Sequence, residues 1–110
     1  MGDGTLERLA ATIKARRHDS GSTSYTRQLL DAGPERCAKK FGEEAVEAVI
    51  AAMGSDPKAL KSEAADTLYH LLVLLEARGV AFADVLAELD KRMATSGLEE
   101  KAARSTRGPT

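Results

Sequence analysis

Apolar residues recur at every third or fourth position along most of this 110-residue chain, the spacing that places them on one face of a helix. The pattern predicts helices over residues 5–17, 25–31, 34–53, 57–78 and 82–94. No segment alternates apolar and polar residues with the two-residue period of a strand, and the sequence has no internal repeat and no glycine-rich phosphate loop. The predicted fold class is all-α, a helical bundle.

Proline and glycine mark the predicted helix boundaries. Pro34 is well placed as the first residue of the third helix, Gly54 as a left-handed cap at its end, and Gly79 as the end of the fourth. Ser55 or Asp56 is expected to cap the start of the fourth helix. Because the connection between the third and fourth helices is short, these two helices must pack antiparallel.

The later helices carry more apolar surface than one neighbour can cover. The fourth helix is apolar nearly all round from Leu68 to Leu75, which is typical of a helix buried on several sides. We expect the apolar face of the fifth helix to point inward through Val85, Leu86, Leu89 and Met93. A short chain cannot bury all of this surface by itself, so we expect a homodimer or a larger assembly, with Leu72 in the seam.

Length and composition narrow the choice of protein class. The length fits one domain over residues 1–110, with a linker over 18–24 and a flexible tail over about 105–110. A net charge of −1 gives no basic face, which argues against nucleic acid as a partner. The single cysteine, Cys37, excludes an internal disulfide and is expected to be a buried reduced thiol. We find no membrane-spanning run and no signal-peptide pattern, so a cytoplasmic location is expected.

Charged residues gather in one segment of the third helix, Lys39–Glu47, which reads Lys-Lys-Phe-Gly-Glu-Glu-Ala-Val-Glu. On a helix, Lys40, Glu44 and Glu47 share a face, with apolar residues close beside them. An unpaired carboxylate in such surroundings destabilises the fold or shifts its pKa until it is neutral. The pattern therefore predicts that a cation meets Glu44.

The fourth helix repeats the acidic pair as Glu63 and Asp66, with His70 one turn further along the same face. Two carboxylate pairs on facing helices offer only oxygen ligands, which suit a hard cation such as Mg²⁺ that also binds substrate phosphates. We therefore predict a Mg²⁺ site formed by Glu44, Glu47, Glu63 and Asp66, and phosphoryl or nucleotidyl chemistry. His70 is placed outside the metal shell, because Mg²⁺ prefers oxygen and a lone helical histidine more often packs.

Three segments carry a resemblance to a known family: Ser24–Thr26 with Leu29 and Gly33, then Lys39–Glu47, then Glu63–Leu72. Through them the chain closely resembles the phosphoribosyl-ATP pyrophosphohydrolases of histidine biosynthesis, members of the all-α nucleotide pyrophosphohydrolase superfamily that includes MazG-like proteins. The likeness covers residues 6–104, and residues 96–104 look like the family's ending. The carboxylates alone are specific to the superfamily, whereas the Ser-Tyr-Thr segment, the lysine pair and Tyr-His after the second acidic pair indicate this one activity.

The resemblance implies Mg²⁺-dependent hydrolysis of phosphoribosyl-ATP to phosphoribosyl-AMP and pyrophosphate, in a dimer whose active sites are lined by both subunits. Lys39 and Lys40 could then meet the outer phosphates as point charges. Glu43 is a candidate for orienting or deprotonating the attacking water. Glu43 and Glu44 are the two residues predicted to be catalytic. An exposed glutamate without a role is an equal alternative for Glu43.

The substrate pocket is where a related enzyme would differ. Tyr25 and Thr26 are candidate substrate contacts, and Tyr25 would meet the adenine or a ribose unless it is a core residue. A MazG-like enzyme that removes unwanted nucleoside triphosphates would share the fold and the metal site, so it is kept as an alternative. The Ser-Tyr-Thr segment favours the biosynthetic substrate.

Two further interpretations involve other classes of protein. A carboxylate-bridged di-iron bundle needs Glu-x-x-His at i, i+3, whereas here Thr67 stands three residues before His70. A non-catalytic helical dimerisation module would leave its acidic residues on solvated faces. The apolar neighbours of Glu44, Phe41 and Ala48, argue against that module.

Overall fold

The computed structural model describes residues 4–18 and 24–95, and these residues form helices and no strand. The helices are α1 (Thr5–Arg17), α2 (Tyr25–Ala32), α3 (Pro34–Met53), α4 (Pro57–Ala77) and α5 (Phe82–Met93). The all-α prediction is confirmed, and each helix agrees with its predicted bounds to within one residue. None of these helices is long and apolar enough to cross a membrane. The predicted tail over 105–110, the family ending over 96–104 and linker residues 19–23 lie outside the described residues.

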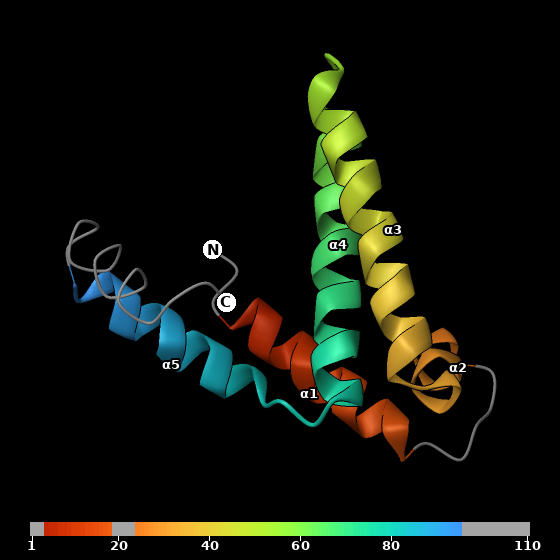
Figure 1. Ribbon diagram of the computed structural model, residues 1–110, viewed down its shortest axis with the longest axis vertical. Coiled ribbons are helices and arrows are strands. Elements are labelled where there is room, and N and C mark those ends of the chain that lie inside the picture. The colour runs from red at the N-terminus through yellow and green to blue at the C-terminus, as the bar shows by residue number, and fades with distance from the viewer. Residues whose placement is uncertain (1–3, 19–23, 96–110) are drawn as a thin grey trace.

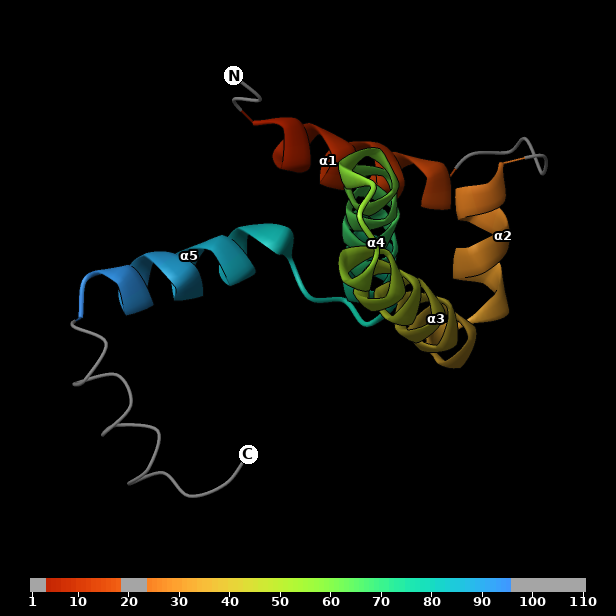
Figure 2. The same cartoon turned by 90° about the horizontal axis from the view of Figure 1, so that it is seen from above.

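The fold is organised around the hairpin of α3 and α4, which lie side by side and antiparallel (Figure 1). Helices α1 and α2 pack against the base of this hairpin, and Figure 2 shows α1 beside α4 and α2 beside α3, while α5 extends away. The buried apolar residues come from α1, α2, α3 and α4: Ile13, Leu29, Leu30, Cys37, Leu72 and Val73. As predicted, Cys37 is a buried free thiol. The core therefore sits at the base and leaves the far half of the hairpin uncovered.

Side-chain caps begin two of the helices. The Ser24 hydroxyl accepts a hydrogen bond from the backbone N–H of Arg27 at 3.2 Å at the start of α2. The Asp56 carboxylate accepts one from the backbone N–H of Lys58 at 3.0 Å at the start of α4. Of the two predicted caps for α4, Asp56 is thus the one used, and Ser55 is not. Each cap satisfies a backbone donor that the helix itself leaves unpaired.

Glycine ends α4 as predicted but ends α3 in a different way. Gly79 adopts a positive φ of 72°, and the N–H that follows it, of Val80, donates to the Leu75 carbonyl at 2.9 Å. The left-handed cap predicted at Gly54 is wrong, because Gly54 has φ −87° and an extended backbone. Extended backbone here carries the chain directly to Pro57, whose ring also disfavours helical backbone in the residue before it.

The predicted burial of α4 holds for only part of its length. Leu72 is 4% exposed and Val73 is fully buried within one chain, whereas Leu68 is 44% exposed. Helices α1 and α2 cover the second half of α4, so Leu72 packs in the core of its own chain. The expectation that Leu72 lies in a seam between subunits is therefore wrong.

The expectation that the apolar face of α5 points inward is also wrong for most of that face. Phe82, the first residue of α5, packs against the core, and Val85 and Leu86 are partly exposed. Leu89 is 48% exposed and Met93 is 76% exposed. The reason is that α5 leaves the base after its first turn and extends away from the hairpin (Figure 1).

Candidate functional site

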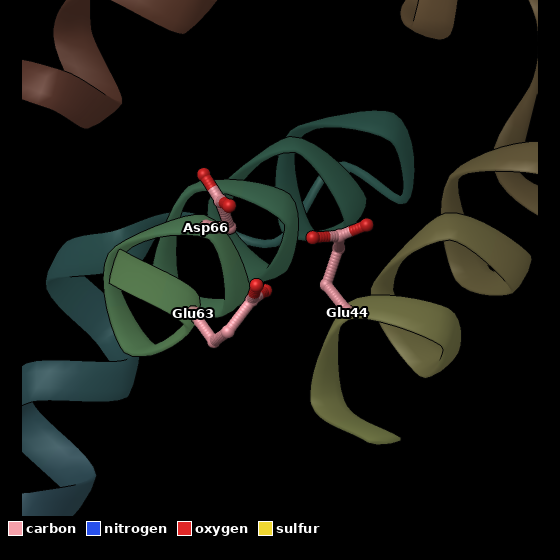
Figure 3. Close-up of side chains that lie close together, drawn as sticks. All are labelled: Glu44, Glu63 and Asp66. Atoms are coloured by element: carbon pink, nitrogen blue, oxygen red, sulfur yellow. The ribbon is translucent and has the colours of Figure 1, made fainter. Parts of the chain in front are cut away.

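Three carboxylates meet between the facing sides of α3 and α4. Glu44 from α3 and Glu63 and Asp66 from α4 each offer one oxygen atom, and these atoms all lie within 4.8 Å of one another. Figure 3 shows the carboxylates of Glu44 and Glu63 pointing toward one another across the space between the helices, with Asp66 beside them. The antiparallel hairpin thus brings together three of the four residues predicted to bind a metal.

Glu63 is the member of this group whose environment most needs a cation. Its Oε1 atom is shielded from solvent and has no hydrogen-bond donor among the described residues. Burial raises the pKa of the Glu63 carboxyl, and the negative charges of Glu47, Asp66 and Glu44 raise it further. A cation bound by these oxygens would satisfy the buried acceptor and offset the repulsion, and an all-oxygen set suits a hard divalent ion. The residues present therefore fit a metal such as Mg²⁺.

Glu47, the fourth predicted ligand, lies at the edge of this group. Its side chain is exposed, and it is not one of the three carboxylates whose oxygens converge. Its charge is nevertheless the largest electrostatic contribution to the raised pKa of Glu63, after burial. Among the described residues, Glu47 thus lies beside the three converging carboxylates and not with them.

Lys40 supplies part of the positive charge that the sequence led us to expect beside Glu44. Its Nζ atom lies 3.8 Å from Oε2 of Glu44 and 3.6 Å from Oε1 of Glu43. The Glu44 side chain is only 13% exposed, whereas that of Glu43 is 48% exposed. Lys39 is exposed on the same helix. The structure therefore places Lys40 and Glu43 at the rim of the acidic group.

Thr67 links the two helices directly beneath the carboxylates, a role that sequence analysis missed. Its hydroxyl lies 2.8 Å from the Glu63 carbonyl oxygen and 3.1 Å from that of Glu44, and it can donate to either. The first contact is the ordinary bond of a helical threonine to its own helix, so only the second required knowledge of the neighbouring helix. The contact with the Glu44 carbonyl joins α3 to α4 beside the three carboxylates.

His70 lies one turn beyond Asp66 and uses both ring nitrogens within the protein. Its Nδ1 atom is 2.8 Å from the backbone oxygen of Asp66, and its Nε2 atom is 3.3 Å from the hydroxyl oxygen of Tyr25. The side chain is buried, with 7% of its surface exposed. Since neither nitrogen is turned to the carboxylates, the geometry is consistent with the prediction that His70 is not a metal ligand.

The two candidate substrate contacts on α2 are both engaged with α4. The Tyr25 hydroxyl meets His70, and the Thr26 hydroxyl is hydrogen-bonded to that of Tyr69. Burial raises the pKa of the Tyr69 hydroxyl, and the hydrogen bond with Thr26 offsets part of this effect. Tyr25 still leaves 48% of its surface exposed, so it is not a core residue. Tyr25 and Thr26 therefore contact α4 one helical turn beyond Asp66, and both of their hydroxyls are hydrogen-bonded there.

Comparison with known proteins agrees with the family resemblance seen in the sequence. Residues 6–93 match the family model described as phosphoribosyl-ATP pyrophosphohydrolase. A relative from Cereibacter sphaeroides named phosphoribosyl-ATP pyrophosphatase is 60% identical over 99 residues, which cover 90% of this chain and 96% of the relative. Phosphoribosyl-ATP pyrophosphatase 1 of Rhodopseudomonas palustris is 60% identical, covering 91% of this chain and 94% of its own length. The corresponding protein of Paracoccus denitrificans is 61% identical, with 90% and 92% covered.

Proposed function

Because the chain belongs to the phosphoribosyl-ATP pyrophosphohydrolase family, we propose that it hydrolyses phosphoribosyl-ATP to phosphoribosyl-AMP and pyrophosphate in histidine biosynthesis, with Mg²⁺ as its metal. We assign the metal to Glu44, Glu63 and Asp66, with Glu47 as the fourth carboxylate at the edge. The observation that carries this assignment is the buried Oε1 atom of Glu63, which has no hydrogen donor within the described residues and faces two further carboxylates.

The chain's own residues divide the work of the reaction. When bound, Mg²⁺ supplies positive charge that neutralises the phosphate oxygens and the leaving pyrophosphate. Lys40, held at the rim by Glu43 and Glu44, gives a point charge for the outer phosphates, and the exposed Lys39 can add a second. Water attacks one of the two phosphorus atoms joined by the oxygen that bridges the α and β phosphates. A P–O bond to the water oxygen forms, the P–O bond from that atom to the bridging oxygen breaks, and the products are phosphoribosyl-AMP and pyrophosphate. Glu43 is exposed enough to orient that water and accept its proton.

We also propose that the enzyme works as a homodimer in which a second copy covers the far half of the hairpin. Between Cys37 and His70 every residue remains at least partly exposed in the single chain. The large apolar side chains exposed on this part of α3 and α4 are Val46, Val49, Ile50, Met53, Leu60 and Leu68. Those on α3 recur at helical spacing and form one stripe, which we call the α3 stripe (Val46, Val49, Ile50 and Met53). Packing two such surfaces about a two-fold axis would complete a four-helix core.

The function is tested by measuring turnover of phosphoribosyl-ATP and of ordinary nucleoside triphosphates, with and without Mg²⁺. We expect hydrolysis of phosphoribosyl-ATP that needs Mg²⁺ and is lost in Asp66→Asn and Glu47→Gln, while helical content is kept. Addition of Mg²⁺ should raise the melting temperature of the wild type and not that of Asp66→Asn. Glu35→Gln is the matched control, because it removes an exposed carboxylate from the first turn of α3, far from the acidic group.

Two results would contradict these assignments in different ways. Full activity in Asp66→Asn would overturn the metal site. Faster turnover of ordinary nucleoside triphosphates than of phosphoribosyl-ATP would overturn the substrate and favour the MazG-like alternative.

A further inference from the structure

Two pairs of side chains join the first turn of α2 to α4. The Tyr25 hydroxyl oxygen lies 3.3 Å from Nε2 of His70, and the hydroxyl of the next residue, Thr26, is bonded to that of Tyr69. Consecutive residues of α2 thus contact consecutive residues of α4. Both contacts lie one helical turn beyond Asp66, and so connect α2 to the helix that carries two of the three converging carboxylates.

His70 forms the middle of a chain of hydrogen bonds from α4 to α2. Its Nδ1 atom is 2.8 Å from the Asp66 carbonyl oxygen, and because a carbonyl can only accept, Nδ1 carries the hydrogen. In the neutral ring Nε2 is then an acceptor, and the Tyr25 hydroxyl donates to it. The Tyr69 ring packs against the His70 ring, with centroids 4.9 Å apart and planes at 86°. This buried imidazole therefore fixes the position of Tyr25 relative to Asp66.

Tyr25 is anchored by its hydroxyl and yet remains exposed. The residue is 48% exposed, although its hydroxyl is hydrogen-bonded and its ring is stacked on that of Tyr69 with centroids 6.4 Å apart and planes at 22°. The surface turned away from Tyr69 is therefore where a ligand can contact the ring. Nucleic-acid bases commonly stack on exposed aromatic rings, whatever the sequence of bases. One turn of helix advances about 5.4 Å, so the anchor of this ring lies about that far along α4 from Asp66. A nucleotide whose phosphates meet the carboxylates can bring its nucleoside part to this distance.

We propose that His70 is a positioning residue, which holds the ring of Tyr25 as a stacking platform for the nucleoside part of the substrate; this inference rests on the proposed function. His70 contacts neither the metal nor the substrate. It acts through Tyr25, and the pair Thr26–Tyr69 holds the same turn of α2 at a second point. The carboxylates bind the phosphate end of the substrate, and this platform binds the other end.

The test separates binding of the two ends of the substrate, using the Mg²⁺-loaded full-length enzyme. Tyr25→Phe and His70→Phe each remove the hydroxyl–imidazole bond, and we expect each to raise KM for phosphoribosyl-ATP about three- to tenfold with kcat little changed. Calorimetry should show phosphoribosyl-AMP binding weakened by the same factor and pyrophosphate binding unchanged. Because both variants break the same Tyr25–His70 bond, the double variant should be no worse than His70→Phe alone. Tyr25→Ala, which removes the ring itself, should raise KM by about tenfold or more.

Asp31→Asn is the matched control for a loosened α2. It removes the ion pair of Asp31 with Arg27, 3.0 Å long, at the far end of α2 without touching α4, so KM should stay at the wild-type value. The proposal is overturned if Tyr25→Phe leaves KM unchanged, if pyrophosphate binding weakens as much as phosphoribosyl-AMP binding, or if Asp31→Asn raises KM equally. Turnover by the wild type tests the proposed function by itself, because it does not depend on any of these variants.

Discussion

Placing one charge in the α3 stripe should separate the subunits of the proposed dimer. Ile50 is 65% exposed in the single chain, and burying the rest of such a side chain at an interface contributes about 1–2 kcal/mol. In Ile50→Glu this contribution is lost, and burial of an unpaired carboxylate costs a further several kcal/mol. A conservative total is about 3 kcal/mol per subunit. Two-fold symmetry doubles it to about 6 kcal/mol, which raises the dissociation constant by about four orders of magnitude.

Sedimentation at micromolar concentration, with activity measured over a dilution series, checks this expectation. Ile50→Glu should sediment as a monomer and lose turnover, although Ile50 lies outside the carboxylate group. Thr12→Glu is the control, because it adds the same charge to an exposed polar position on α1. Leu72→Glu should instead unfold the chain, since Leu72 is 4% exposed in the core of its own subunit. A wild-type enzyme that sediments as a fully active 11.7 kDa monomer, or an Ile50→Glu variant that stays dimeric, would refute the reasoning.

Two further predictions concern the polar groups between α3 and α4. Since burial and neighbouring carboxylates raise the pKa of Glu63 in the fold, the metal-free enzyme should lose stability as pH rises from the ordinary pKa of this carboxyl through its raised one. The check is to measure the melting temperature of metal-free wild type and Glu63→Gln across this pH range. The melting temperature of the variant should not show this fall with pH, and the variant should be the more stable protein at neutral pH and show no Mg²⁺-dependent turnover. Parallel curves for the two proteins would contradict the prediction. Thr67→Val should lower the melting temperature by about 4 °C through loss of a bond worth about 1 kcal/mol between the helices, and weaken Mg²⁺ binding. Unchanged melting by circular dichroism together with unchanged Mg²⁺ affinity would show that the bond to Glu44 does not hold the site.

Helix bounds and the meeting of the carboxylates were predictable because both depend on local spacing. The period of apolar residues gives each helix, and glycine and proline give most of its ends. The short turn before Pro57 requires an antiparallel hairpin, and this alone brings Glu44 opposite Glu63 and Asp66. These conclusions needed no knowledge of how distant segments pack.

Predictions failed where the identity of the packing partner mattered. An apolar pattern shows that a side chain is buried somewhere, but it does not distinguish burial within the chain from burial in a second copy. Leu72 was therefore assigned to a seam although α1 and α2 cover it, and Leu89 and Met93 were assigned to the core although they are exposed. The contact of His70 with Tyr25 joins residues 45 positions apart on separate helices, so no local spacing could indicate it.

The hairpin also sets the order in which the chain can fold. Helices α3 and α4 are joined only by residues 54–56, so closing this pair sacrifices little chain entropy. The base needs α1, whose Arg17 donates a hydrogen bond to Glu76 from 59 positions away, and a contact this distant in sequence forms more slowly. A refolding chain should therefore bring its acidic side chains together before the base closes. At that stage, their mutual repulsion is a barrier that dissolved divalent cations would lower.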